Sequence, residues 1–325
     1  MSELPRVLLL SCGGTIAAGT SALVPTRDGS EIVALVPEVR QLAAIDVLEF
    51  AVKLSSQLSL EELLDMSSLI ERHLSADPDL AGVVVTHGTG TMEESSFFAD
   101  LVIDDDRPIV FTGAMRGGPG HLSDGPVNLL DAVKIAVDKT SRERGVLVAM
   151  NGEVHTARRA VKRHTLSSGA FDSGEFGPLA VVYPDKIAFG GRVRRSPTIK
   201  PTTLVTNVDL IKFVVGMDDR YVQTSIAAGA SAIVLEGSGL GNLNDLMAEG
   251  VETAIESGVH VVLCSRASYG RTFASYGTAA GSASLAQRGC LFSSLPGPKA
   301  RIFMILALGV TRSSQRLQEL LDACD

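Results

Sequence analysis

Residues 83–94 read VVVTHGTGTMEE, and residues 7–17 read VLLLSCGGTIA. In each stretch a run of apolar residues leads into glycine, with a threonine next to it, Thr89 in the first and Thr15 in the second. Such runs predict strands buried on both faces of a parallel sheet. Glycine at a strand end exposes backbone N–H groups and lets another molecule approach the chain closely. Each threonine is therefore a candidate nucleophile with hydrogen-bond donors at hand.

The same alternation of strand and helix continues to about residue 150. Helix signals include the Gly-Pro pair after Asp124, which places proline near the first helical position. Strands are predicted at 6–10, 47–53, 82–86, 108–112 and 145–150, and helices at 59–73, 91–103 and 126–139. This order predicts an α/β fold with a parallel sheet, in which ligands bind at the carboxyl ends of the strands. Both threonines lie at such ends.

A polar segment, GGRVRRSPTIKPTT at residues 190–203, interrupts the pattern. After it, strands at 210–214, 232–235 and 259–264 alternate with helices at 222–228, 243–257 and 313–323. We therefore predict a catalytic α/β domain at residues 1–190, a linker at 191–203 and a smaller α/β domain at 204–325.

Composition excludes several classes of function. The net charge of −8 disfavours nucleic acid as a partner, and the absence of Trp disfavours a membrane-interface protein. The first apolar run is too short to span a membrane, so we predict a cytoplasmic protein. The four cysteines have no metal-ligand spacing, and no P-loop or H-E-x-x-H motif occurs. The sequence thus predicts neither a cofactor nor a metal.

A threonine hydroxyl is a weak nucleophile and needs a base. Lys162 is a candidate because a desolvated lysine loses its proton readily, although its basic neighbours also fit a solvated surface. His87 is an alternative base, but it adjoins a glycine turn and can simply shape that turn.

At these residues the chain resembles bacterial L-asparaginases and glutaminases. The similarity runs in order, with near-family spacing, from about residue 6 to the end. The segments that carry it are GGTIA at 13–17, HGTGTMEE at 87–94, TGAMR at 112–116, DGPVNL at 124–129, the Lys162 segment, GNL at 241–243, SR at 265–266 and KAR at 299–301.

The resemblance implies a two-domain fold, a homo-oligomer with sites near subunit interfaces, and hydrolysis of a small-molecule amide through a threonine ester. In this family Thr15 matches the primary nucleophile, and Thr89 and Lys162 match two members of a threonine–lysine–aspartate group. Further positions match groups that contact the substrate. These are Ser56, Gln57, Gly88, Gly90, Ala114 (through its carbonyl) and Asn242.

The chain departs from the family in its acidic groups. The family has aspartate where this chain has Gly90, and that aspartate holds the α-ammonium of the substrate. A second carboxylate is expected after Ser265-Arg266, but no Asp or Glu occurs between Glu256 and Glu319, and Arg271 lies there instead. The family's loop tyrosine is also missing, because no tyrosine occurs between Ile16 and Pro37.

An ammonium ion buried without an anion costs several kcal/mol. We therefore expect a substrate that lacks a free α-ammonium, such as an amide, lactam or imide, with Ser56 and Arg271 able to hold a carboxylate. Three alternatives stay open. Asp124 or Asp172 could supply the missing carboxylate, which would make the chain an ordinary asparaginase or glutaminase. The chain could instead be a weakly catalytic small-molecule binding protein, and a nucleotide-dependent enzyme is a more remote possibility.

Overall fold

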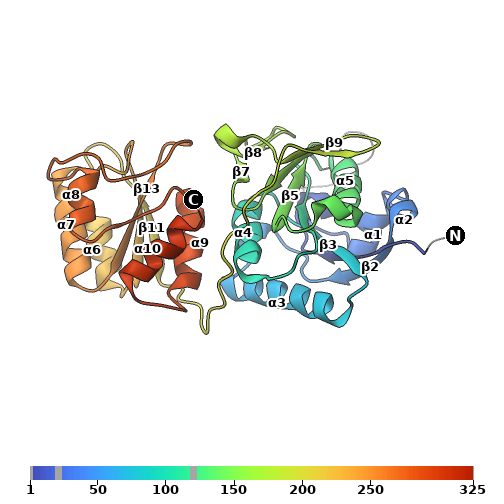
Figure 1. Ribbon diagram of the computed structural model, residues 1–325, viewed down its shortest axis with the longest axis horizontal. Coiled ribbons are helices and arrows are strands. Elements are labelled where there is room, and N and C mark those ends of the chain that lie inside the picture. The colour runs from blue at the N-terminus through green and yellow to red at the C-terminus, as the bar shows by residue number, and fades with distance from the viewer. Residues whose placement is uncertain (1–2, 19–23, 118–122, 325) are drawn as a thin grey trace. The chain divides into compact units, whose positions relative to one another are not determined.

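The computed structural model describes residues 3–18, 24–117 and 123–324. The chain divides into two compact units, Met1–Thr198 and Ile199–Asp325 (Figure 1). This division falls inside the predicted linker, residues 191–203.

The first unit is built on an eight-stranded sheet with the order β10-β9-β6-β5-β4-β3-β1-β2. Five neighbouring strands are parallel, and their apolar runs are the ones that the sequence pattern singles out. They are β1 (Arg6–Ser11), β2 (Ala44–Glu49), β3 (Leu80–Thr86), β4 (Ile109–Thr112) and β5 (Val146–Met150).

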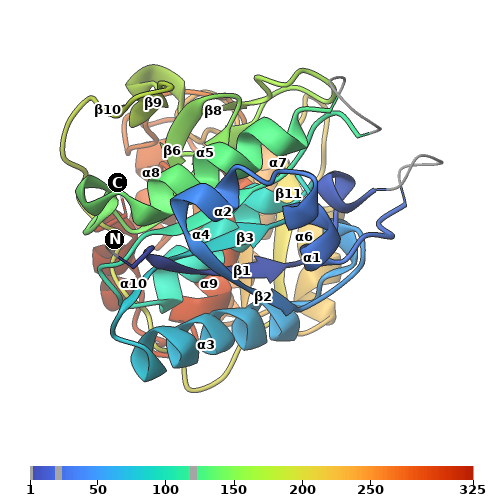
Figure 2. The same cartoon turned by 90° about the vertical axis from the view of Figure 1, so that its right-hand side faces the viewer.

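Helices cover both faces of these five strands, which explains why β3, β4 and β5 are almost continuously apolar. On one face α1 (Gly29–Ala34), α2 (Val39–Leu42) and α5 (Gly125–Val137) pack on a core that includes Leu9 and Val84. The longer α3 (Leu60–Ala76) and α4 (Met92–Val102) lie on the other face (Figure 2). A capping box starts α3, in which Ser59 and Glu62 satisfy each other's backbone N–H groups.

Antiparallel strands extend the sheet beyond β5. These are β6 (Glu153–Thr156), β9 (Ala180–Val182) and β10 (Ile187–Phe189). Between β6 and β9 the chain forms a separate two-stranded ribbon of β7 (Val161–Lys162) and β8 (Phe171–Asp172). The sequence analysis did not predict any of these short strands.

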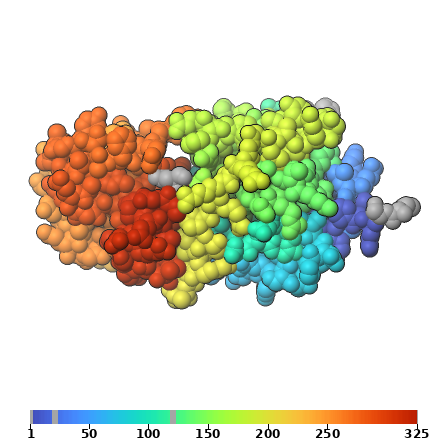
Figure 3. All heavy atoms as spheres, in the orientation of Figure 1, coloured from blue at the N-terminus to red at the C-terminus, as the bar shows by residue number. Residues whose placement is uncertain are grey.

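The last residues of the first unit run along its outside, where they are drawn in yellow in Figure 3. Arg144 donates to the carbonyl of Gly191 at 2.7 Å, and Arg195 forms an ion pair with Asp106 at 3.1 Å. Part of the predicted linker is therefore fixed to the first unit by polar contacts.

The second unit has a four-stranded parallel sheet with the order β11-β12-β13-β14. Its strands are β11 (Val208–Lys212), β12 (Ala232–Gly237), β13 (His260–Ser265) and β14 (Leu291–Phe292). Its helices are α6 (Arg220–Ala227), α7 (Asp245–Glu256), α8 (Ser282–Gln287), α9 (Gly297–Ala307) and α10 (Ser314–Asp322).

The predicted two-domain α/β fold is confirmed, with one strand misplaced. The strand predicted at 47–53 is wrong in its bounds, because β2 spans Ala44–Glu49 and pairs with β1 from Arg6 opposite Ala44. As the edge strand it is only partly buried, so its apolar residues do not mark its ends. The sequence analysis also missed the helices α1, α2, α8 and α9 and the strand β14.

Candidate active site

The two glycine–threonine motifs meet at one edge of the first sheet. Strands β1 and β3 are parallel neighbours, with Ser11 opposite Thr86, so both motifs leave the sheet at its carboxyl edge. The N–H of Cys12 donates to the carbonyl of Thr86 at 2.9 Å. The sequence prediction that both threonines follow strand ends at this edge is therefore correct.

Glycines let the two motifs touch. Gly14 has φ 81°, and a Cβ atom on it would lie 2.4 Å from the Cα of Gly88. Real Cβ atoms do not approach another atom so closely, and this backbone conformation disfavours a side chain in any case. Thr15 follows Gly14 and Thr89 follows Gly88. The backbone segments that carry the two threonines are therefore in contact.

We predict that Gly14→Ala lowers the free energy of unfolding by at least about 3 kcal/mol, because it adds a backbone clash to an unfavourable φ. Gly152→Ala is the matched control, since Gly152 has φ 76° and nothing within 4 Å of its Cβ position. It should cost only about 1 kcal/mol in the same urea titration. Equal losses for the two variants would show that the contact between the motifs is unimportant for stability.

Thr89 is paired with Lys162. The ammonium nitrogen Nζ of Lys162 lies 2.8 Å from Oγ1 of Thr89, and the side chain of Thr89 is almost fully buried. Burial lowers the pKa of Lys162 below the ordinary lysine value, and the charge of Glu93 partly opposes this shift. Among the described residues, no carboxylate forms an ion pair with Nζ. A lysine in this setting is suited to exchange a proton with the threonine.

Thr15 opens a short 3-10 helix, Thr15–Ala17, directly after Gly14. Its side chain is half-buried, and its hydroxyl makes no hydrogen bond to any other residue that the structure describes. The loop that follows includes residues 19–23, which lie outside the described residues.

The turn Ser55–Gln57 borders the Thr89 motif. Ser56 and Gln57, the predicted substrate contacts, are exposed on this turn. The sequence analysis assigned no role to Ser55, which is buried and whose Oγ accepts a hydrogen bond from the N–H of Thr91 at 3.3 Å. Nothing in the sequence distinguishes Ser55 from the adjacent Ser56 as a residue with a structural role.

Gly90 is exposed, and the space beside it is open. A Cβ atom there would meet only Ser55 Oγ, at 3.3 Å, and the backbone of Gly90 is not left-handed. An aspartate would therefore fit at this position, but this chain has no side chain there.

The loop after β4 completes this side of the site. A Cβ atom on Gly113 would lie 3.3 Å from the methyl group of Thr89, so Ala114 follows a residue in contact with Thr89. Asn128 supports the loop by donating to the carbonyl of Gly113 at 2.9 Å. Ala114 is buried. Burial of its side chain is compatible with the predicted role, because that role uses only the backbone carbonyl.

The two carboxylates considered as replacements for the missing aspartate have other partners. Asp124 accepts from the N–H groups of Met115 and Arg116 at 3.1 and 2.9 Å. Asp172 accepts from the N–H of Gly174 at 2.7 Å and lies 3.6 Å from Arg163. Neither forms an ion pair with Lys162.

His87 is not placed to act as the base. Its Nδ1 donates to the carbonyl of Gly88 at 2.8 Å, its ring packs on Phe111, and burial lowers its pKa to about 4. It therefore stays neutral and shapes the turn.

Cys12 is also buried, with Sγ 3.7 Å from the sulfur of Met66, and burial raises its pKa. All four cysteines are buried thiols, and none of them forms a disulfide.

Asn242 and Arg271 belong to the second unit. The side-chain oxygen of Asn242 accepts from the N–H of Ser282 at 2.9 Å, which starts α8. Arg271 is exposed on the loop after β13.

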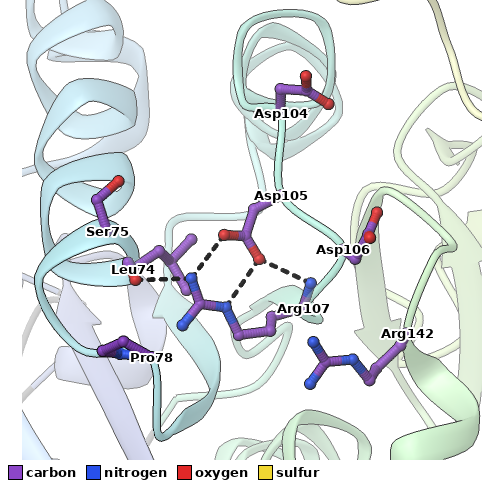
Figure 4. Close-up of a pocket in the computed structure, with 8 residues that line it drawn as sticks. All are labelled: Leu74, Ser75, Pro78, Asp104, Asp105, Asp106, Arg107 and Arg142. Carbon is purple, nitrogen blue, oxygen red and sulfur yellow. Dashed lines mark hydrogen bonds and ion pairs between the residues drawn. The ribbon is translucent and has the colours of Figure 1, made fainter.

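A hollow of about 570 Å³ lies at the opposite edge of the first sheet, where α3 and α4 end (Figure 4). Its central side chain, Arg107, is held by both carboxylate oxygens of Asp105 and by the carbonyls of Leu74 and Asp77. This arrangement commits four of the five guanidinium N–H donors of Arg107 to the protein itself and stabilises the loop before β4. The hollow is therefore a structural feature separate from the threonine site.

Among residues 3–18, 24–117 and 123–324, no three His, Cys, Asp or Glu side chains are grouped to hold a metal ion. Within the same described residues, no helix has the length and apolarity needed to cross a membrane.

Comparisons with known proteins agree with this geometry. The family model for the N-terminal domain of asparaginase matches residues 6–194, and the model for the glutaminase/asparaginase C-terminal domain matches residues 207–321. L-asparaginase 2 of Escherichia coli is 34% identical over 98% of this chain and 92% of its own length. L-asparaginase 2 of Bacillus subtilis is 32% identical over 97% of this chain and 86% of its own length.

A solved structure, described as a probable cytoplasmic L-asparaginase from Campylobacter jejuni, superposes with a TM-score of 0.88. It is 31% identical and the match covers 97% of this chain and 98% of that one. Another relative, from Haemophilus influenzae, is described as a probable periplasmic L-asparaginase. Because relatives of both kinds occur, the predicted cytoplasmic location stays a prediction.

The fold and these matches define a hydrolase that acts on the carbon–nitrogen bonds of amides. The chain belongs to the asparaginase/glutaminase family, as its signature segments indicated.

Proposed function

We propose that this amidohydrolase uses Thr15 as its nucleophile and acts on a small-molecule amide, lactam or imide without a free α-ammonium. The observation that carries the substrate proposal is the open space at Gly90, where the family's ammonium-binding aspartate is expected. The relatives are named L-asparaginase or glutaminase-asparaginase, so the substrate is where this chain is proposed to differ from them.

The electrostatics near Gly90 support this proposal. Asp124 and Asp172 are engaged elsewhere, and position 90 itself carries no side chain. An ammonium group entering here would lose its water without the aspartate that the family places at this position to compensate for it. A substrate whose α-position is neutral avoids that cost.

The proposed reaction needs no cofactor. The Oγ1 atom of Thr15 attacks the amide carbon, the carbon–nitrogen bond breaks, and the nitrogen leaves after it takes up a proton. Water then cleaves the threonine ester, which restores Thr15 and releases the acid. As Thr15 attacks, it passes its proton to Thr89, and neutral Lys162 takes the proton of Thr89 across their 2.8 Å contact. The protonated lysine then returns a proton through Thr89 to the leaving nitrogen. The hydroxyl of Thr15 has no partner among the described residues and so is available to a substrate.

Several residues are proposed to bind the rest of the substrate. Ser56 and Gln57 are exposed on the turn beside Gly88, where a carboxylate of the substrate could reach them. Arg271 and Asn242 are proposed to contribute from the second unit through assembly of a homo-oligomer. Light scattering of the purified protein tests the assembly.

The test of the substrate proposal is Gly90→Asp, assayed on L-asparagine and on succinamate, which is asparagine without its α-ammonium. We expect kcat/KM for L-asparagine to rise by about 10- to 100-fold, because the new carboxylate pairs with the ammonium. The rate on succinamate should not rise. Ammonia release measures both reactions.

Gly90→Asn is the matched control because it fills the same space without the charge. If Asn raises L-asparagine hydrolysis as much as Asp does, the missing charge is not the reason for poor asparagine binding. If wild type hydrolyses L-asparagine efficiently and Asp changes nothing, the chain is an ordinary asparaginase.

A further inference from the structure

Glu93 links Lys162 to the segment that carries Thr89, the threonine that Lys162 contacts. It lies in the first turn of α4, four residues after Thr89, and its Oε2 accepts a hydrogen bond from the backbone N–H of Lys162 at 2.7 Å. The side-chain Nζ of the same lysine lies 2.8 Å from Thr89. Both ends of Lys162 are therefore held by one short segment, residues 89–93.

This contact ties the strand that carries Lys162 to helix α4. Strand β7 has two residues, Val161–Lys162, and pairs only with β8 in a ribbon outside the main sheet. An isolated two-stranded ribbon is marginally stable in water. The hydrogen bond to Glu93 joins this ribbon to a helix packed on the main sheet, which fixes where the lysine side chain starts.

The charge of Glu93 also acts on the lysine. Glu93 is the carboxylate that raises the pKa of Lys162 against the lowering effect of burial. Other charged groups near β7 include Arg163 and Asp172, which lie 3.6 Å from each other, Arg158 and Arg159, which precede the strand, and Glu94 in the same turn as Glu93. With glycine at position 90, no aspartate can act on Lys162 from the place where the family has one.

We propose that Glu93 is a positioning residue that anchors Lys162 to the Thr89 segment and supplies a negative charge beside it in place of the aspartate absent at Gly90. This inference rests on the proposed role of Lys162 in proton transfer. It names a residue that touches neither the substrate nor the reacting atoms.

Three variants test it without any substrate. Glu93→Gln keeps an acceptor for the Lys162 N–H and removes the charge, and Glu93→Ala removes both. Glu94→Gln, the matched control, removes a charge from the same turn of α4. NMR of ¹³C-labelled lysine follows the titration of Lys162, whose signal is assigned by its loss in Lys162→Arg, and amide hydrogen exchange reports the backbone hydrogen bond.

We expect the titration midpoint of Lys162 to fall by roughly half a pH unit in Glu93→Gln and not in Glu94→Gln, as for a partly screened charge pair. The Lys162 amide should keep its protection in Glu93→Gln and lose at least about 10-fold in Glu93→Ala. A midpoint in Glu93→Gln equal to that in Glu94→Gln overturns the electrostatic part of the proposal, and full protection in Glu93→Ala overturns the anchoring part. If Glu93→Ala does not fold, Glu93→Asp replaces it, since the shorter side chain should also weaken the anchor.

Kinetics separate this inference from the proposed function. At a pH above both midpoints, Glu93→Gln should keep kcat within about 3-fold of wild type, whereas Glu93→Ala should lose at least about 10-fold. If no amide is hydrolysed by wild type, the proposed function fails, while the NMR titration still decides the role of Glu93.

Discussion

Thr15→Ala should lower kcat on the best amide substrate by at least about 1,000-fold while substrate binding is retained. The reason is that the variant removes the atom proposed to form the ester and leaves the Thr89–Lys162 pair and the turn Ser55–Gln57 in place. Ammonia release measures the rate, and calorimetry measures binding. If the chain were a non-catalytic binding protein, wild type and Thr15→Ala would bind the amide equally well and neither would hydrolyse it.

Thr15→Ser is the matched control. It keeps the hydroxyl and should retain activity within about 10-fold, and rapid quenching followed by mass spectrometry should detect an ester on residue 15. An ester found on Thr89, or a Thr15→Ala variant that keeps most of its activity, would contradict the assignment. Thr89 would then be the nucleophile, with Lys162 already in contact as its base.

Lys162→Met should also lower kcat by at least about 1,000-fold, because the variant leaves no base at Thr89. The pH profile of the wild type gives a second test. Lysine accepts a proton only when neutral, so activity should fall as the pH drops below the pKa of Lys162. Burial lowers that pKa, so the acidic limb of the profile should lie below the ordinary lysine value of 10.5.

Lys162→Arg distinguishes two roles for Lys162, that of a base and that of a fixed positive charge. Arginine keeps the positive charge and the hydrogen-bond donors but does not deprotonate. The kcat of Lys162→Arg should therefore fall as far as that of Lys162→Met. Substantial activity in this variant would mean that the lysine acts only through its charge. Lys186→Met, on the exposed turn between β9 and β10, should leave the rate unchanged.

Much of the first unit could be predicted because burial on both sides leaves a plain signal. Strands β1 and β3 are continuous apolar runs, and each ends in the glycines that let the two motifs touch. The edge strand β2 is half-exposed, so its apolar residues do not mark its ends. Helix α9 is almost entirely buried, and a helix without a polar face lacks the periodicity that identifies one.

The site was predicted where a residue type implies chemistry, and missed where only the fold brings residues together. Thr89 stood out as a hydroxyl beside glycine, whereas Lys162, one of several neighbouring basic residues, was singled out by the family resemblance; the structure places the two side chains in contact. Glu93 looks like any acidic residue in the first turn of a helix, where the helix dipole favours it. Its contact with Lys162 depends on the path of a ribbon 69 residues further along the chain, for which no local pattern exists.

The central claim is that this site is built for an amide without an α-ammonium. The most direct test is the ratio of kcat/KM for succinamate to kcat/KM for L-asparagine, measured on the wild-type protein by ammonia release. Because position 90 carries no carboxylate and a Cβ atom there would meet only Ser55 Oγ within 4 Å, we predict a ratio clearly above one, by about 10-fold or more. A ratio below one, with L-asparagine hydrolysed at a low millimolar KM, would contradict the claim.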